Sequence, residues 1–400
     1  SLPGTLEKIA YSAFKKCTAL EKVVFTDGLK EIDGKKDDKG NIYGAFSGCS
    51  ALKEIVLPAS LEKIGAEAFR LCGKLEKVTF AGNSALVWIG DSAFASCKNL
   101  GEFDVPASVE YVGDNILNSC SSLTNLTGGA GIKELDVNAL GSLPSLCEHS
   151  SNLTFKVVTF ANVALGYQGV CPAKLTTDML NGATAIAANA FKDTAELTEI
   201  DIAVSELGNS VFENCTKLEK ITLSGDLTII PMRAFMNAGS KSGKTLEVKL
   251  PEGITKVDAR AFFNSAITSV ELPNCTVVTS SYSDTSDGRV YYGSFEGCTN
   301  LTSVKFGENR VNLNRNTFRG CVALTSVEFA GTAFGCAFEG CTALTQVTIN
   351  ADPEGYAKLD KIADPDLIEP KGYVFVGGSR QRLSMDNMPS FQEITDFANE

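Results

Sequence analysis

The chain has 400 residues, enough for two or three ordinary domains or for one long repeat array. It carries 36 Lys and Arg against 48 Asp and Glu, a net charge of −12, so it lacks the basic character that nucleic acid or an anionic membrane surface would require. No apolar run approaches the roughly 18 to 20 residues that cross a bilayer, and we expect neither a transmembrane segment nor a signal peptide within this sequence.

A phrase of the form Ala-Phe-x-x-Cys-x-x-Leu-x-x-Val-x-Phe recurs along the chain. Its motif Phe residues include Phe14, Phe46, Phe69, Phe94, Phe212, Phe295, Phe318 and Phe338. Phe46, Phe69 and Phe94 are spaced by 23 and 25 residues. A fixed period in the twenties is typical of a solenoid, in which each repeat packs on the next.

Each copy also predicts its own local structure. Residues 22–25 alternate polar and apolar side chains, so we expect a short strand with Val23 and Phe25 facing a core. A second apolar pair, such as Leu61 and Ile64, predicts an opposite wall. Residues 68–72 between the walls are predicted to form a short helical or 3-10 turn. With weaker copies included, about 14 rungs form a right-handed repeat solenoid of the α/β leucine-rich-repeat class. Parallel ladders are expected at residues 23–25, 78–80, 304–306 and 327–329, with every motif Phe buried.

The run LPASLEKIGAEAFRLC at residues 57–72 resembles the BspA-type leucine-rich repeats found on surface proteins of anaerobic bacteria and of some protozoan parasites. The resemblance covers about residues 2–349 and is specific, because the phrase recurs many times. It implies a surface or secreted location and an adhesive role toward host or microbial partners.

The pattern also predicts the domain organisation. Residues 1–350 are expected to form the solenoid, with an irregular joint near 147–180 that includes a very degenerate rung at Leu165. Two insertions, residues 35–42 and 279–290, are predicted as surface loops. Residues 351–400 carry no repeat phrase and are predicted as a C-terminal cap or the start of a further region, with a strand at 372–376 and a helix at 389–399.

Nine of the 13 cysteines occupy one slot of the phrase: Cys17, Cys49, Cys72, Cys97, Cys120, Cys215, Cys298, Cys321 and Cys341. The slot also accepts Thr194, Ala238 and Ser265, so we interpret it as a packing position filled by buried, reduced thiols. A uniform ladder gives each thiol two equal neighbours and no unique partner. Any disulfide is therefore expected among the four cysteines outside the slot, which are Cys147, Cys171, Cys275 and Cys336.

Catalytic and metal sites are not expected. His149 is the only histidine, no Cys-x-x-Cys pair marks a zinc site, and no Gly-rich phosphate loop is present. The Asp-containing insertions do not match a calcium-loop spacing. We predict a protein that is not an enzyme and that needs no cofactor and no metal.

The outward face of the strand ladder carries charges whose signs alternate from rung to rung. One predicted column is Lys22, Glu54, Lys77, Glu102 and, after the joint, Glu199, Lys220, Glu247; a second is Lys249, Glu271, Lys305, Glu328. Opposite charges on neighbouring strands stabilise their pairing, so a register-setting role competes with a ligand-binding role. Towards the C-terminus the face becomes rich in hydroxyls, which lose less free energy on desolvation than charges do. The candidate partner-binding residues there are Thr302, Ser303, Lys305, Thr325, Ser326, Glu328, Thr345, Gln346 and Thr348.

The opposite wall holds a second candidate. Its outward residues are predicted as Lys8, Glu31, Lys63, Trp88, Tyr111 and Glu134, which brings the only Trp against a Tyr on the next rung. Such a pair either stiffens the wall or anchors a partner.

Two classes of function follow. The first is a monomeric adhesion protein that binds a protein or glycan at a host or microbial surface. The alternative is a structural spacer that displays another domain and has no ligand of its own. A hydroxyl-rich or apolar patch that runs across three or more rungs would favour the first class.

Overall fold

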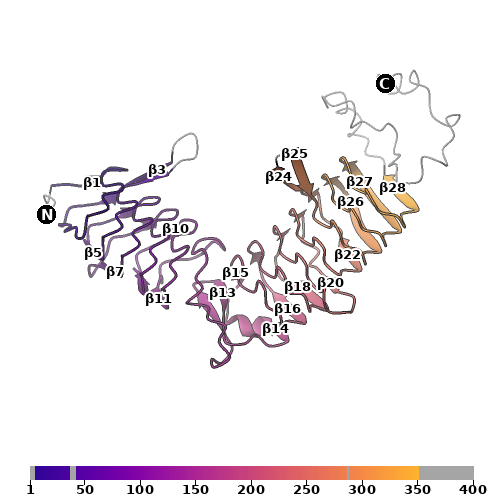
Figure 1. Ribbon diagram of the computed structural model, residues 1–400, viewed down its shortest axis with the longest axis horizontal. Helices are drawn as coiled ribbons and strands as arrows, with labels where there is room; N and C mark the ends of the chain where they lie inside the picture. Colours follow the sequence, from indigo (N-terminus) through magenta and orange to yellow (C-terminus); the bar gives the residue numbers. More distant parts are fainter. Residues whose placement is uncertain (1–4, 37–41, 286–287, 351–400) are drawn as a thin grey trace, which may run out of the picture. The chain divides into compact units, whose positions relative to one another are not determined.

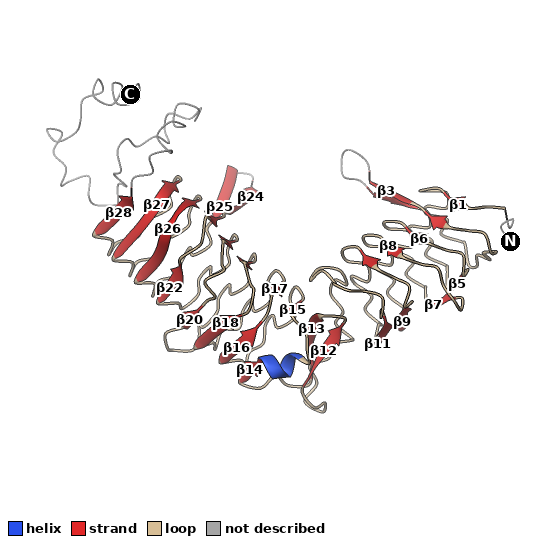
Figure 2. Cartoon of the chain, turned by 180° about the vertical axis from the view of Figure 1, so that it is seen from behind, coloured by secondary structure: helices blue, strands red, loops and turns tan. Residues whose placement is uncertain are grey.

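The computed structural model describes residues 5–36, 42–285 and 288–350. Within them the chain is a β-solenoid of about 14 turns with parallel ladders and almost no helix, which confirms the predicted repeat architecture. The chain divides into two compact units (Figures 1 and 2). Unit 1 comprises Ser1–Cys171 and Asp178–Ala190, and unit 2 comprises Pro172–Thr177 and Phe191–Glu400.

Unit 1 has two walls of parallel strands. The short-strand wall pairs, in order, β1 (Lys8–Ile9), β2 (Glu31–Ile32), β6 (Lys63–Ile64), β8 (Trp88–Ile89) and β10 (Tyr111–Val112). The long-strand wall pairs β5 (Glu54–Leu57) with β7 (Lys77–Phe80), and β9 (Glu102–Val105) with β11 (Asn125–Gly128). In β5 and β9 the apolar residues at alternate positions point inward and are buried, as the period of two predicts, whereas Val112 of β10 and Leu126 of β11 are half-buried.

Unit 2 repeats this arrangement. Its long-strand wall contains β14 (Lys174–Thr176), β16 (Glu199–Ala203), β18 (Lys220–Ser224) and β20 (Glu247–Lys249), and then β22 (Ser269–Leu272) beside β26 (Ser303–Leu313). The long-strand wall continues through the first halves of β26 and β27 (Ser326–Ala333) to β28 (Gln346–Asn350). The short-strand wall contains β19 (Ile229–Ile230), β21 (Lys256–Val257), β23 (Val277–Val278) and the second halves of β26 and β27. Residues 206–207 form the strand β17 (Glu206–Leu207).

The two walls meet within single strands in the last rungs. The first residues of β26 pair with β22 and its last two with β23, so the strand crosses from one wall to the other without a break. In two earlier rungs a proline, which has no backbone N–H, follows the long-wall strand directly: Pro58 after β5 and Pro273 after β22.

The turn that carries each motif Phe is not the predicted helical or 3-10 segment. The backbone N–H groups of Glu67, Phe69 and Leu71 donate to Asp91, Ala93 and Ala95 on the next rung, at 2.8, 2.8 and 2.9 Å. These donors are unavailable for bonds within a helix.

Left-handed backbone conformations make this turn possible. Glu67 and Leu71, two residues before and after Phe69, have φ of 54° and 62°. The same two positions are left-handed in most rungs, for example at Asn214 and Asn237. Each motif Phe turn thus adds two or three backbone hydrogen bonds to the next rung, so the solenoid has a third ladder besides its two walls. Close stacking explains the glycine of the Ile-Gly phrase, because a Cβ on Gly90 would lie 2.7 Å from the backbone nitrogen of Ala66.

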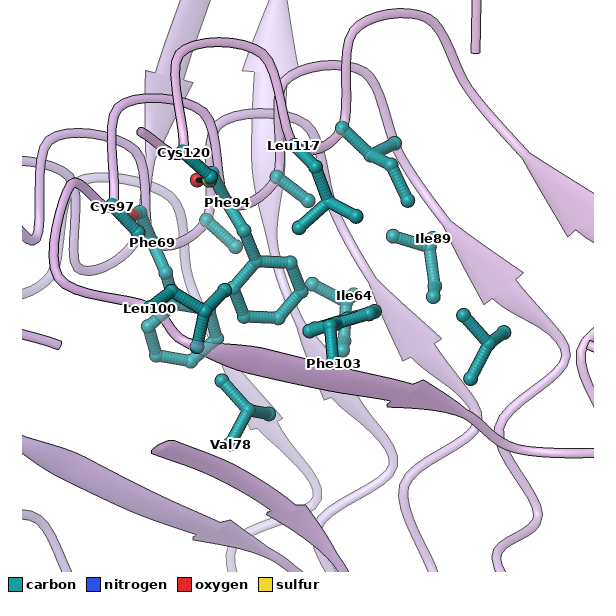
Figure 3. Packing of buried hydrophobic residues seen from close by; sticks show 14 of the residues in the cluster. Ile64, Phe69, Val78, Ile89, Phe94, Cys97, Leu100, Phe103, Leu117 and Cys120 are labelled. Carbon is teal, nitrogen blue, oxygen red and sulfur yellow. Dashed lines mark hydrogen bonds between the residues drawn. The ribbon is translucent and has the colours of Figure 1, made fainter. Parts of the chain in front are cut away.

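Stacked phenylalanines form the centre of the core (Figure 3). In unit 1 the ring centroids of Phe46, Phe69 and Phe94 follow one another at 5.3 Å with planes within 8° of parallel. In unit 2 the stack runs through Phe191, Phe212, Phe235, Phe262, Phe295, Phe318 and Phe338 at 5.3 to 5.6 Å. Each fully buried Phe contributes on the order of 2 to 3 kcal/mol through the apolar surface it removes from water.

The first rung departs from the prediction. Phe14 is half-buried and Cys17 is exposed, so the expectation that every motif Phe and slot cysteine is buried is wrong here. Residues 23–25 also form no strand; their segment makes one isolated bridge, between Lys22 and Glu54. An end rung has a neighbour on one side only, and its apolar wedge is incompletely covered. The three other predicted ladders are confirmed in β7, β26 and β27.

Both insertions were predicted as loops, but the residues that the structure describes at their ends pair as antiparallel strands. β3 (Gly34–Lys36) pairs with β4 (Ile42–Gly44), and β24 (Ser281–Thr285) pairs with β25 (Gly288–Tyr292). Residues 37–41 and 286–287 lie outside the described residues. In each case the hairpin leaves the rung between a short-wall strand and the next Phe turn.

Residues 147–180 depart from the parallel pattern. Instead of a rung at Leu165, β12 (Lys156–Phe160) pairs antiparallel with β13 (Val163–Gln168), with an irregularity at Val158 and Thr159, and β13 then pairs with β15 (Ala185–Ile186). The 3-10 helix η1 (Thr177–Leu180) also lies in this stretch. The strand and helix expected within 351–400 lie outside the described residues.

Candidate functional site

The thiol groups do more than fill space. All 13 cysteines are free, so no disulfide joins the four cysteines outside the slot, and eight of the nine slot cysteines are buried. Each buried slot thiol donates a hydrogen bond to the carbonyl oxygen of the motif Phe one rung earlier. The Sγ to O distances run from 2.9 Å for Cys298 to 3.4 Å for Cys72. The slot therefore favours a small side chain, usually with a donor. Thr194 donates to the oxygen of Phe191 in its own rung and Ser265 bonds to the Cys298 thiol, whereas the buried Ala238 fills the slot without a donor.

Burial makes these thiols unreactive. It raises the pKa of Cys72, Cys120 and Cys298 to about 12 and places that of Cys97 well above its ordinary value. The thiolate is the form that attacks electrophiles and binds metals. The cysteine ladder is thus a structural element and carries no redox chemistry.

His149 is also built into the fold. Its ring stacks on that of Tyr167 at 4.0 Å between centroids, and burial lowers its pKa. Within the described residues, no group of three or more His, Cys, Asp and Glu side chains is placed to hold a metal ion. We find no helix in the same residues with the length and apolar character of a membrane span.

The alternating charge columns of the long-strand wall are confirmed by the strand register. In unit 1, Glu54 lies opposite Lys77, and the Lys77 Nζ lies 3.6 Å from Glu102. In unit 2, Glu199 lies opposite Lys220, which in turn lies opposite Glu247.

In unit 2 the charged column begins one rung earlier than predicted, at Lys174. Lys174, inside the irregular stretch, lies opposite Glu199 with a 2.9 Å ion pair. The column from Glu271 through Lys305 to Glu328 is in register as well. Its first predicted member, Lys249, lies outside that register, because β20 meets the next rung through a single bridge between Leu246 and Ile267.

The hydroxyl-rich patch is contiguous across four strands. Ser269, Ser303, Ser326 and Gln346 lie side by side on β22, β26, β27 and β28, and all four side chains are exposed. We call this row the neutral column. It borders the charged column of Glu271, Lys305 and Glu328 on the same strands. In that column the Lys305 Nζ lies 3.9 Å from Glu271, and Glu328 lies opposite Thr348.

The threonines that precede this patch in each rung form hydrogen bonds between neighbouring rungs. Thr302, Thr325 and Thr345 each donate their hydroxyl hydrogen to the backbone oxygen of the equivalent residue one rung earlier, at 2.9, 3.3 and 3.2 Å. Their hydroxyl oxygens keep lone pairs that can accept. A partner could therefore use these threonines as acceptors, whereas Ser303 and Ser326 can offer both a donor and an acceptor.

The aromatic pair on the short-strand wall of unit 1 is formed as predicted. Trp88 and Tyr111 are in register, and their rings stack at 3.5 Å between centroids and 18° between planes. Lys63 lies over the other face of Trp88 at 5.9 Å, and it also forms an ion pair with Glu31. Both rings remain about 40% exposed. One face of each ring is covered by the other ring, and Lys63 lies over Trp88, so a partner would contact the remaining face of Tyr111.

Two features of the sequence escaped the predictions. The residue two positions after the motif Phe is often Asn or Gly, which signals the left-handed turn. The arginines are also unevenly distributed: six of the nine lie between residues 233 and 319. Several of them gather at the β24–β25 hairpin described below.

Comparisons with known proteins agree with the repeat pattern. A family model described as the BspA type leucine rich repeat region matches, in six copies, residues 1–36, 42–148, 174–287 and 286–358. The chain is similar to a leucine-rich repeat protein from Bacteroides ovatus, with 22% identity and a TM-score of 0.42 over 86% of this chain and 77% of that one. It is also similar to the pneumococcal vaccine antigen PcpA, with 18% identity and a TM-score of 0.41 over 88% and 78%.

The C-terminal residues match a different family. Residues 362–400 match a model described as wyosine base formation. Over 46 residues the chain is 56% identical to the S-adenosyl-L-methionine-dependent tRNA 4-demethylwyosine synthases of Pyrococcus horikoshii and Pyrococcus abyssi. This stretch is 12% of this chain and spans 14% of each relative's length. Residues 362–400 lie outside the described part of the chain.

Proposed function

Because the chain belongs to the BspA-type leucine-rich repeat family, we propose that it is an adhesion protein, located at a cell surface or secreted, that binds a protein or glycan partner. The proposed contact surface is the long-strand wall of the last rungs of unit 2, centred on the neutral column. We propose no catalytic activity, since the family match runs over the repeat rungs and the likeness to an enzyme covers 14% of that enzyme's length.

The observation that supports this proposal is the continuity of the neutral column. Four exposed polar side chains without charge follow one another across four strands. In unit 1 the corresponding column carries alternating Lys and Glu. A partner that covered such ion pairs would remove them from water, which tends to cancel what the contact gains. Hydroxyl and amide groups can exchange water for a partner at a lower cost.

The spacer function has its own support in unit 1. On the short-strand wall, Glu31 accepts ion pairs from both Lys8 and Lys63, at 2.9 and 3.2 Å, and Lys63 continues to the stacked Trp88 and Tyr111. These contacts join five successive rungs from side to side. These lateral contacts stiffen unit 1 as a spacer would require, and the two functions are compatible in one chain.

An array of glycans and of host-surface and matrix proteins, probed with the purified chain, tests the proposal. The informative variant is Ser303→Lys with Ser326→Lys and Gln346→Lys, which places three long cationic side chains on the neutral column. We expect every signal that depends on this surface to fall by at least about tenfold, while the melting temperature changes little, because exposed substitutions usually cost less than about 0.5 kcal/mol.

A matched control adds the same charge to the same rungs outside the wall. Thr299, Val322 and Thr342 are exposed and lie in the turns before β26, β27 and β28. The variant Thr299→Lys with Val322→Lys and Thr342→Lys should bind as the unmodified chain does. If both triple variants bind alike, the neutral column is not the contact surface. The variant Trp88→Ala with Tyr111→Ala then tests the aromatic pair, and an array without any specific signal would favour the spacer.

A further inference from the structure

The β24–β25 hairpin brings a cluster of tyrosines and arginines together on another side of unit 2. The hairpin leaves its rung between β23 and the Phe295 turn, away from β22 (Figure 1). Its base is fixed to the following rung, because the Asn316 side chain donates to the backbone oxygen of Tyr291 at 2.7 Å. The cluster is therefore held by the solenoid and does not depend on the hairpin tip.

Each tyrosine of the hairpin has a guanidinium over its ring. Arg260, one rung earlier, lies 3.5 Å from the ring centroid of Tyr292. Arg315, one rung later, lies 5.0 Å from that of Tyr291, and Arg289 lies 4.6 Å from that of Tyr282. A guanidinium stacked on a ring is held in place while its N–H groups stay free to bind an anion at the edge.

The arginines of this cluster differ in their acidic partners. Arg289 pairs with Asp284 at 3.1 Å, and Arg319 pairs with Glu296 and Glu339 at 3.5 and 3.0 Å. Within the described residues, Arg260 and Arg315 form no ion pair. Two guanidinium groups thus lie near each other without an ion-pair contact to a carboxylate, although the chain carries a net charge of −12.

A third arginine adds to the positive charge. Arg233 lies one rung before Arg260, and the Nε atoms of both are buried without a hydrogen-bond partner. Burial, followed by the neighbouring charge of Arg233, lowers the pKa of Arg260, while the charges of Glu296 and Glu213 oppose that shift. An anion bound at this place would add to this partial compensation of the two like charges.

Apolar surface lies beside the charge. Tyr282 is 53% exposed and Val290 is 38% exposed, and the rings of Tyr282 and Tyr291 lie 5.9 Å apart. Exposed Tyr and Arg side chains are the residue types that dominate binding energy at interfaces. Flat aromatic rings also suit the apolar faces of sugar rings, whose hydroxyls remain in water.

We propose that this cluster, which we call the Tyr–Arg site, binds an acidic polysaccharide through Arg260 and Arg315 and stacks its sugar rings on the tyrosines. Arg260 and Arg315 lie on rungs that flank the hairpin rung, which separates their positions by two rung spacings, about 10 Å. That distance is comparable with a disaccharide unit, so a glycan with one carboxylate or sulfate on every second sugar matches both guanidinium groups. The Tyr–Arg site is independent of the neutral column and does not rest on the proposed function.

Binding of the whole chain to defined polymers tests this site. The probes are hyaluronan for carboxylates, heparin for sulfates, dextran as a neutral glycan, and poly-glutamate and single-stranded DNA as polyanions without acidic sugars. We expect hyaluronan or heparin to bind, with affinity that falls as salt rises, and dextran, poly-glutamate and DNA to bind at least tenfold more weakly. Binding of hyaluronan or of heparin identifies the acidic group.

Substitutions locate the site. Arg260→Gln with Arg315→Gln should weaken binding by about tenfold or more per guanidinium, because a charge-assisted hydrogen bond is lost at each. Tyr282→Ala should weaken binding without changing its salt dependence. The control Lys217→Gln with Lys244→Gln removes the same charge from unit 2 at exposed, ion-paired lysines and should leave binding unchanged. Arg315→Gln alone serves if the double variant folds poorly.

Three results would overturn the proposal. One is equal binding to poly-glutamate or DNA, which would identify an acidic peptide or a nucleic acid as the partner class. Another is equal loss in the lysine control, which would indicate attraction by overall charge. The third is the absence of binding to any acidic glycan. The variant Ser303→Lys with Ser326→Lys and Gln346→Lys should keep its glycan binding, so failure here is distinct from failure at the neutral column.

Discussion

The Sγ atom of Cys97 lies 3.3 Å from the carbonyl oxygen of Phe69, one rung earlier. The same relationship joins Cys72 to Phe46. Phe69 is fully buried, and its carbonyl oxygen accepts a second hydrogen bond from the backbone N–H of Cys72 at 3.3 Å, so the thiol satisfies the remaining lone pair of a buried acceptor. The recurrence of Cys in the repeat phrase therefore follows from two demands at once, a small volume and a donor.

Replacing this thiol separates the two demands. We expect Cys97→Ala to lower the free energy of unfolding by about 1 kcal/mol, because it removes one of the two hydrogen bonds that the Phe69 carbonyl accepts and leaves only the one from the backbone N–H of Cys72. Cys97→Ser keeps a donor and should cost less. Chemical denaturation of the three proteins measures the order. The exposed Cys17 supplies the control, since Cys17→Ala should change stability by less than about 0.5 kcal/mol. A serine variant that is less stable than the alanine variant would mean that volume alone decides.

Thiol labelling tests the accessibility of the whole ladder. The reduced chain has 13 free cysteines, of which Cys17 and Cys336 are exposed. A thiol reagent should modify these two quickly in the native protein and all 13 in denaturant without reductant. The variant Cys17→Ala with Cys336→Ala should show almost no fast labelling. A denatured count near one would instead reveal disulfides and contradict the free-thiol ladder.

Stability should fall at alkaline pH because of the same thiols. The pKa of Cys72 rises from its ordinary value of 9.0 to about 12 in the folded chain. Below pH 9 the thiol is neutral in both states, whereas between pH 9 and 12 it ionises in the unfolded chain alone. Each such thiol therefore lowers stability by up to about 1.4 kcal/mol per pH unit in this window.

Thermal unfolding at a series of pH values measures this effect. Lysines and tyrosines titrate in the same range, so the comparison of variants carries the test. Cys72→Ala should make the loss of stability between pH 9 and 12 shallower than in the unmodified chain, whereas Cys17→Ala should leave the slope as it is. Parallel slopes in all three proteins would show that the buried thiols do not govern the alkaline transition.

The sequence predicted what repeats within one rung and missed what depends on contacts between rungs. The period, the parallel ladders and the alternating charges follow from positions such as Lys77 and Glu102, which occupy the same place in successive copies of the phrase. The turn was predicted incorrectly because the N–H of Phe69 bonds to Ala93, a partner 24 residues away that no local propensity encodes.

The candidate sites show the same division. The stacking of Trp88 on Tyr111 could be predicted, since both occupy one column of the repeat. The contact of Arg260 with Tyr292 could not, because Tyr292 belongs to an insertion whose hairpin geometry is absent from the repeat phrase. The first rung was predicted as a regular copy, yet Phe14 lacks a neighbour on one side. The repeat phrase is the same at the end of an array as in its middle, so it does not predict this difference in burial.

The left-handed turn gives the last prediction. Leu71 has φ of 62° and its side chain is 48% exposed, so it accepts the strain of a left-handed conformation and buries little apolar surface in return. Equivalent positions hold Asn214, Asn237 and Gly320, residue types that adopt this conformation at low cost.

We expect Leu71→Gly to raise the free energy of unfolding by about 1 kcal/mol. This is the net of about 1 to 2 kcal/mol of relieved strain and the opposing, greater chain entropy of glycine in the unfolded state. Leu71→Ala, which retains a Cβ, should gain less, and Leu71→Asn should fall between the two. Denaturation midpoints of the three variants measure the order, and a glycine variant less stable than the alanine variant would show that the Leu71 side chain, and not its backbone, determines stability at this turn.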